Sequence, residues 1–96
     1  MSTDRVVRLD ATVTGRVQGV SFRYYTLQEA QRLGLVGWVA NQRDGSVKVV
    51  AEGPESVLQA FVGFLRTGSP LAVVDKVIES RGLATGEFSS FRIRSI

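Results

Sequence analysis

The stretch GRVQGVSFR, residues 15–23, lies between a strand-like run and a helical pattern. Upstream, residues 6–13 alternate between apolar and polar side chains, which is typical of a half-buried strand. Downstream, the apolar residues of 22–33 fall within one arc of a helix, and Gly34 is typical of the residue that follows a helix end. The sequence therefore predicts a glycine-containing connection from a strand to a helix.

The rest of the chain extends this pattern in a regular order. Two short strands, 36–42 and 46–52, flank an Asp-Gly pair, which is a strong hairpin signal. Pro54 suits the first position of a second helix. A strand over 72–79, whose irregular pattern is typical of a bulge, and a short strand over 91–93 follow. The order β-α-β-β-α-β predicts a ferredoxin-like α+β sandwich, an antiparallel sheet with two helices on one face.

The composition limits the class of protein. A length of 96 residues suits one domain, expected over residues 1–96, and 44% hydrophobic with 22% charged residues is ordinary for a folded chain. No apolar run approaches the roughly 18 residues of a membrane span, and the first five residues carry no apolar signal segment. We therefore expect no membrane association and a cytoplasmic location. A monomer is the default expectation.

The residues that are missing limit the chemistry. The chain has no cysteine and no histidine. Disulfides, thiolate nucleophiles, Ser-His dyads and the usual zinc ligands are therefore excluded. An enzyme built from this chain must act by positioning and electrostatics, or through carboxylates, on an already activated substrate. The net charge of +3 favours anionic partners in general.

The stretch 15–23 has the features of an anion site. Two glycines allow positive φ and a close backbone approach, so that the amides of residues 16–20 can form a concave nest. The helix that follows adds free N–H groups and its positive end, and Arg23 can add a bidentate guanidinium. The alternative is that the glycines only permit a tight connection and that Arg23 is solvated. The stretch lacks the Gly-Lys-[Ser/Thr] of a nucleotide-binding loop.

A second stretch, GWVANQRDGSV at residues 37–47, places Asn41 near the end of a strand. Together the two stretches resemble the signatures of the acylphosphatase family. EGPE at 52–55 and FLRTGSP at 64–70 also stand where that family has similar segments. The resemblance extends over about residues 7–93, and it implies the ferredoxin-like fold that the strand and helix order also predicts.

The resemblance implies a metal-independent hydrolase without cofactor, whose partner is a small-molecule acyl phosphate and not nucleic acid. The family cleaves the carboxyl–phosphate bond to give a carboxylate and inorganic phosphate. Its phosphate-binding arginine corresponds to Arg23 and its water-orienting asparagine to Asn41. Its phosphate cradle corresponds to the backbone of five residues: Arg16, Val17, Gln18, Gly19 and Val20. Ser21, Tyr24 and Tyr25 stand at positions interpreted as variable.

The predicted fold and its residues also allow other interpretations. An RNA-recognition module shares the fold, but the two strands expected at its centre, 6–13 and 46–52, lack the aromatic residues that stack on bases. A non-catalytic domain that binds acyl or carbamoyl phosphate is the stronger alternative, and a free-standing enzyme is expected. Asp44 is interpreted as a turn residue and not as a general base, and Trp38 as a half-buried sheet residue.

Overall fold

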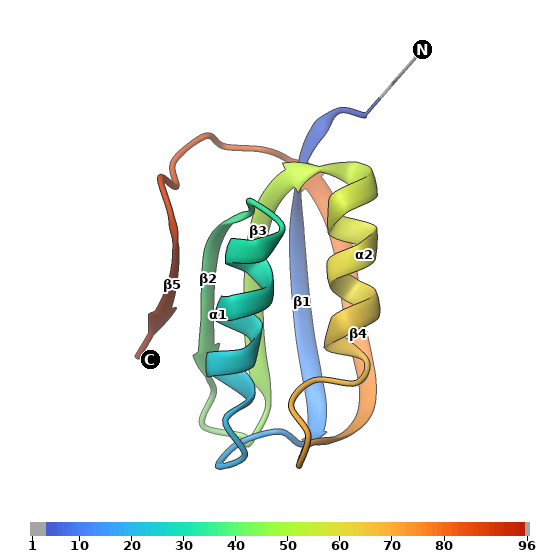
Figure 1. The fold of residues 1–96 in the computed structure, drawn as a ribbon, viewed down its shortest axis with the longest axis vertical. Helices are drawn as coiled ribbons and strands as arrows, with labels where there is room; N and C mark the ends of the chain where they lie inside the picture. Colours follow the sequence, from blue (N-terminus) through green and yellow to red (C-terminus); the bar gives the residue numbers. More distant parts are fainter. Residues whose placement is uncertain (1–3, 96) are drawn as a thin grey trace.

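The computed structural model describes residues 4–95, so both ends of the domain expected over 1–96 extend beyond the described residues. No helix within residues 4–95 is long and apolar enough to cross a membrane. Five strands and two helices follow one another along the chain (Figure 1): β1 (Val6–Arg16), α1 (Phe22–Arg32), β2 (Val36–Asn41), β3 (Val47–Pro54), α2 (Glu55–Leu65), β4 (Val73–Leu83) and β5 (Phe91–Arg94). The predicted order of elements is confirmed.

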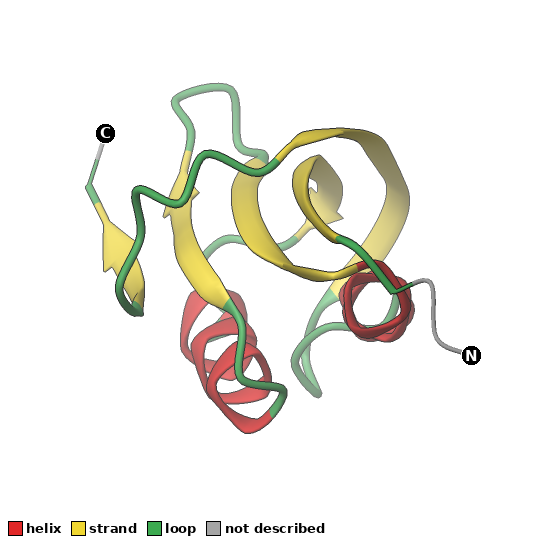
Figure 2. Ribbon diagram, turned by 90° about the horizontal axis from the view of Figure 1, so that it is seen from above, coloured by secondary structure: helices red, strands yellow, loops and turns green. Residues whose placement is uncertain are grey.

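The strands form one sheet in the order β4-β1-β3-β2-β5, and β1 and β3 are central as expected. The first four strands are antiparallel to their neighbours, whereas β5 pairs in parallel with β2 at the edge. Both helices lie on the same side of the sheet (Figure 2). The structure is thus the predicted α+β sandwich, with a short parallel strand added beside β2.

Several element ends differ from the sequence-based expectation. β4 continues beyond residue 79 to Leu83, because its last residues pair with the first half of β1. The bulge expected in this strand is confirmed, since the register shifts where Asp75 stands between the residues paired with Thr14 and Gly15. Pro54 is not the first helical residue of α2. It is extended, with φ −60° and ψ 143°, and it ends β3 at the N-cap of the helix.

The core lies between the sheet and the helices. Alternate residues of β1 face the helices and are fully buried, as the alternating pattern predicted. Phe61 of α2 packs edge-to-face on Phe91 at a centroid distance of 6.0 Å, which joins β5 to the core. The largest fully buried side chains include these: Phe22, Phe61, Leu9, Leu58 and Leu65. One continuous core therefore holds both helices against the sheet and includes a residue of its edge strand β5.

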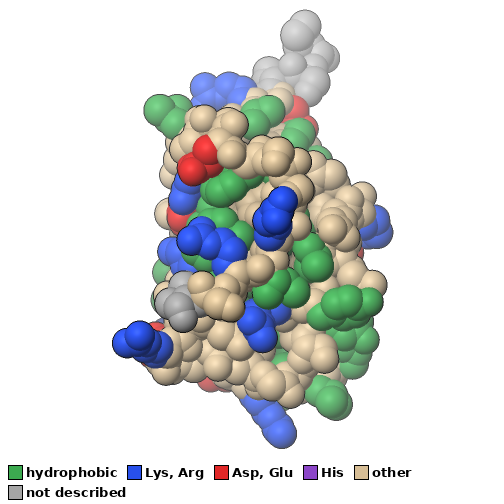
Figure 3. All heavy atoms as spheres, turned by 90° about the vertical axis from the view of Figure 1, so that its left-hand side faces the viewer, with side chains coloured by type: hydrophobic (Ala, Val, Ile, Leu, Met, Phe, Trp, Pro, Cys, Tyr) green, Lys and Arg blue, Asp and Glu red, His purple; other side chains and the backbone are tan. Residues whose placement is uncertain are grey.

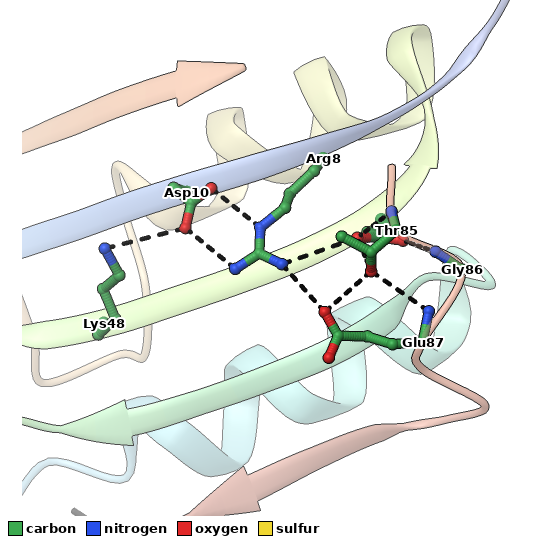
Figure 4. Close-up of polar contacts among 7 residues, drawn as sticks. Arg8, Asp10, Lys48, Thr85, Gly86 and Glu87 are labelled. Atoms are coloured by element: carbon green, nitrogen blue, oxygen red, sulfur yellow. Dashed lines mark hydrogen bonds and ion pairs between the residues drawn. The ribbon is translucent and has the colours of Figure 1, made fainter. Parts of the chain in front are cut away.

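The opposite face of the sheet carries a buried carboxylate. Glu52, near the end of β3, has only 3% of its side chain exposed. Its two oxygens accept hydrogen bonds from the Thr85 amide (2.9 Å), the Thr85 hydroxyl (2.9 Å) and the Gly86 amide (3.0 Å). Arg8 of β1 lies 3.9 Å away and also pairs with Asp10 and Glu87 (Figure 4).

Burial alone would raise the pKa of Glu52. The amides, the Thr85 hydroxyl and the Arg8 guanidinium together outweigh burial and lower the pKa below its ordinary value of 4.5. Glu52 is therefore ionised at neutral pH, and it fastens the segment 84–90, which links β4 to β5, onto the sheet.

Candidate active site

A cleft of about 340 Å³ opens where the β1–α1 loop, the start of α1, the end of β2 and β5 meet. This is the lower end of the molecule in Figure 1. Of the residues that the structure describes, eight line the cleft: Val17, Gly19, Ser21, Phe22, Arg23, Tyr24, Asn41 and Ile93. The structure thus brings Arg23 and Asn41, which are 18 residues apart in the sequence, to one cavity.

The loop before α1 has an unusual backbone. Gly19 has φ 76°, and Ser21 has φ 62° and ψ 24°, which makes Ser21 the one non-glycine residue within 4–95 that has positive φ. Alternation between left-handed and ordinary conformations turns successive N–H groups toward one side and forms an anion nest. A serine in this region costs about 1–2 kcal/mol, so the surrounding structure must hold it there. Such strain is typical of a ligand-binding loop.

The start of α1 has no negative charge of its own. Ser21 is the N-cap, but its side chain makes no capping bond, and the first turn contains no acidic residue. α2 differs, because Glu55 stands in its first turn and the Asp4 carboxylate accepts a hydrogen bond from the Ser56 amide at 2.9 Å. The free N–H groups and positive end of α1 are therefore available to an anion from outside the chain.

Arg23 is the one charged side chain among the residues that line the cleft. It is half-buried, and within residues 4–95 it has no ion pair or side-chain hydrogen bond. An unpaired guanidinium beside free amides makes a site for an anion with several oxygens, such as a phosphoryl group.

Asn41 is the last residue of β2 and pairs with Val47 of β3. Its Oδ1 is buried and lacks a hydrogen-bond partner among the described residues. A buried amide oxygen without a partner costs about 1–3 kcal/mol, so a polar group that enters the cleft would restore a bond. A water molecule bound here would lie in the same cavity as the anion held by Arg23.

The remaining residues of the expected phosphate cradle have different positions. Val17 and Gly19 line the cleft, whereas Arg16 is still in β1 and pairs with Val73. The Gln18 side-chain NH₂ group donates hydrogen bonds to the backbone carbonyls of Gln42 (2.7 Å) and Ser46 (2.9 Å), which ties the loop to the β2–β3 turn. The Val20 carbonyl accepts a hydrogen bond from the Ser69 hydroxyl at 2.6 Å. Gln18 and Val20 thus hold the loop in position from its two sides.

A sequence model of the Acylphosphatase family matches residues 9–93, which include every residue that lines the cleft. The chain belongs to the acylphosphatase family. It is accordingly a hydrolase that acts on the carboxyl–phosphate bond of acyl phosphates.

Acylphosphatases of other organisms support this assignment over most of the chain. An acylphosphatase of Arthrobacter sp. (strain FB24) is 51% identical over 87 residues, which are 91% of this chain and 80% of the relative. The crystal structure of the Bacillus subtilis acylphosphatase superposes with a TM-score of 0.89 at 40% identity and covers 92% of this chain and 98% of its own. A Coxiella burnetii acylphosphatase superposes with a TM-score of 0.88 at 33% identity, over 98% and 100% of the two chains.

The two side chains interpreted from the sequence as structural do not belong to the acylphosphatase cleft. Asp44 accepts hydrogen bonds from the Ser46 amide (2.9 Å) and hydroxyl (2.6 Å), and these bonds lower its pKa. It is the turn residue that the Asp-Gly pair predicted. Trp38 is half-buried, and the Arg94 guanidinium covers its ring at 4.5 Å. Neither residue is among those that line the cleft.

Sequence reasoning missed several residues of the cleft. The sequence indicates variable positions at Ser21 and Tyr24 and a short strand at Ile93, yet all three residues line the cavity. An unusual φ at Ser21 has no sequence signal, and the place of β5 depends on its pairing with β2.

Figure 3 shows the face on which β5 lies, where Lys and Arg side chains gather with little acidic surface between them. A surface of this kind attracts anionic substrates.

Proposed function

We propose that Arg23 and the amides of residues 16–20 hold the phosphoryl group of an acyl phosphate, and that Asn41 orients the attacking water. The observation that supports this most is that one cleft is lined by Arg23, whose guanidinium has no partner within residues 4–95, and by Asn41, whose buried Oδ1 has none among the same residues. The start of α1, without an acidic residue, adds its free amides to the same cavity. No metal ion is needed, because the cation and the amides supply the positive charge.

The reaction is a single displacement. The water oxygen attacks phosphorus and forms the new P–O bond, while the bond from phosphorus to the acyl oxygen breaks. The electron pair of that bond leaves with the carboxylate. The water proton passes to a phosphoryl oxygen of the substrate, so that the products are a carboxylate and inorganic phosphate. Arg23 and the amides stabilise the charge on the equatorial oxygens in the transition state.

The chemistry suits this set of residues. A carboxylate is a good leaving group, so no general acid is needed. Asn41 is neutral and cannot act as a base, but its amide oxygen can accept a hydrogen bond from water and fix its direction of attack. A nucleophilic side chain is not required either, which agrees with a chain that has neither cysteine nor histidine.

Two substitutions test the two roles. Arg23→Gln should abolish both turnover and the rise in Tm that inorganic phosphate causes by binding the folded state. Asn41→Ala should reduce kcat by roughly 10²–10³, the scale for one preorganised polar group, while phosphate still raises Tm. Arg66→Gln is the matched control, because this arginine lies at the C-cap of α2 and does not line the cleft.

The measurements are hydrolysis of benzoyl phosphate with and without EDTA, and thermal unfolding with and without phosphate. Normal turnover by a folded Asn41→Ala variant would refute the role of Asn41. Loss of wild-type turnover in EDTA would refute the metal-free reaction. Binding of phosphate without turnover by the wild-type chain would favour the non-catalytic alternative.

We also propose a domain organisation, an oligomeric state and a location for the chain. The family match over residues 9–93 and the single continuous core support one domain over 1–96. A monomer in the cytoplasm is the proposed state. Sedimentation of the purified chain and fractionation of cells that produce it are the corresponding tests.

A further inference from the structure

The cleft extends beyond the groups assigned to the phosphoryl group and the water. Tyr24 of α1 and Ile93 of β5 also line it, and both are large apolar side chains that remain partly exposed, at 53% and 41%. They are 69 residues apart in the sequence and line one cavity. We call Arg23 and the amides of residues 16–20 the phosphoryl seat. Since the bond that breaks joins the phosphoryl group to the acyl group, the acyl group must lie in the part of the cleft next to this seat.

The Tyr24 ring is held in place before any substrate binds. Gln28, one turn further along α1, donates a hydrogen bond from its amide to the Tyr24 hydroxyl at 3.0 Å. The Tyr25 ring packs against it edge-to-face, at a centroid distance of 5.8 Å and an angle of 81°. A ring with two such contacts forms a flat wall, and binding against it costs little further ordering.

The charges of the cleft restrict the kind of acyl group. Among residues 4–95, Arg23 is the one cation that lines it, and the phosphoryl group binds to this cation in the proposed complex. A second anionic group on the acyl part would therefore face Tyr24 and Ile93 without a partner in the cleft. An apolar planar group would instead cover both side chains and bury apolar surface.

We propose that Tyr24 and Ile93 form an acyl-binding wall that makes the enzyme favour acyl phosphates with an apolar, planar acyl group. The proposal rests on the phosphoryl seat at Arg23 described above. Tyr24 contributes an aromatic ring for stacking, and Ile93 contributes an aliphatic side chain to the same cavity. Neither residue takes part in the bond-breaking step, so the wall acts on the choice of substrate.

The test compares two substrates, benzoyl phosphate with an aryl acyl group and acetyl phosphate with a single methyl group. The readout is the ratio of kcat/KM for benzoyl phosphate to kcat/KM for acetyl phosphate. Tyr24→Ala should lower this ratio about three- to tenfold, as expected for one aromatic stacking contact, mainly through KM for benzoyl phosphate. Tyr24→Phe is the matched control, because it keeps the ring and loses only the bond to Gln28.

Ile93→Ala is the second variant and should lower the ratio in the same direction. A ratio that stays at the wild-type value in both alanine variants would overturn the proposal. So would a loss of inhibition by inorganic phosphate in Tyr24→Ala, because the ring would then belong to the phosphoryl seat. The seat itself is tested separately by Arg23→Gln, so that failure of the wall and failure of the seat give different results.

Discussion

Replacement of Glu52 by glutamine tests whether the buried carboxylate fastens the segment 84–90 to the sheet. The carboxylate oxygens accept three hydrogen bonds, two of them from the amides of Thr85 and Gly86. Glutamine has the same shape but only one acceptor oxygen. Its NH₂ group must face at least one of these donors, which then has no acceptor.

The expected cost follows from the smallest possible loss. If the glutamine NH₂ group faces only the Gly86 amide, one part-buried hydrogen bond to a charged acceptor is lost, at about 1.5–3 kcal/mol. Arg8 keeps Asp10 and Glu87 as partners, so it adds little to the loss. A loss of about 2 kcal/mol in the free energy of unfolding lowers Tm by about 8–16 °C for a domain of this size.

The assay is urea or thermal unfolding at pH 7, with Glu87→Gln as the matched control. Glu87 lies in the same segment and also pairs with Arg8, but its side chain is 57% exposed, so its removal should cost at most about 1 kcal/mol. The kcat of Glu52→Gln should stay at the wild-type value. Glu52 pairs with Val36 at the start of β2, five residues or about 17 Å along the strand from Asn41.

The pH dependence gives a second measurement. Because the folded state lowers the pKa of Glu52, its contribution to stability is present above the ordinary value of 4.5 and is lost as the pH falls below it. The difference in stability between the wild type and Glu52→Gln should therefore narrow below about pH 4.5. Equal midpoints of unfolding for the two proteins at pH 7 would refute this account of Glu52.

Three further substitutions test other features of the structure. Gln18→Ala should lower stability by about 1–2 kcal/mol and weaken inhibition by phosphate, because it releases the loop from the β2–β3 turn; unchanged inhibition would contradict this. Ser21→Gly should leave the fold intact and raise Tm slightly, because it removes left-handed strain, and a lower Tm would show that the strain is absent. Thr26→Val should raise the free energy of unfolding by about 1 kcal/mol, since the buried Thr26 hydroxyl has no partner within residues 4–95; a clear loss of stability would contradict this.

The sequence predicted those parts of the fold whose signals are local. A local pattern marks each of three features: the alternation of β1, the Asp-Gly pair of the hairpin and Gly34 after α1. All three form as expected. The extension of β4 to Leu83 has no such signal. Nearly all of its last residues are exposed, so no hydrophobic pattern marks them, and only pairing with β1 defines them.

The candidate site divides in the same way. Arg23 and Asn41 stood in recognisable stretches, and the fold brings them to one cleft. Ile93 joins that cleft through the parallel pairing of β5 with β2, a contact between residues more than fifty positions apart. The burial of Glu52 likewise depends on a distant segment that covers it. The positions of such side chains cannot be predicted from local sequence patterns, because they depend on contacts between distant segments.

The position of β5 has a consequence for how the enzyme responds to partial denaturation. This strand has four residues, lies at the edge of the sheet and pairs with β2 alone. Short edge elements open locally at a lower free energy than central strands, so the amides of β5 should exchange hydrogen before those of β1 and β3. Opening of β5 would remove Ile93 from the cleft while Arg23 and Asn41 stay on α1 and β2. Substrate selectivity and turnover would then be lost at different denaturant concentrations, selectivity first, because they depend on parts of the molecule with unequal local stability.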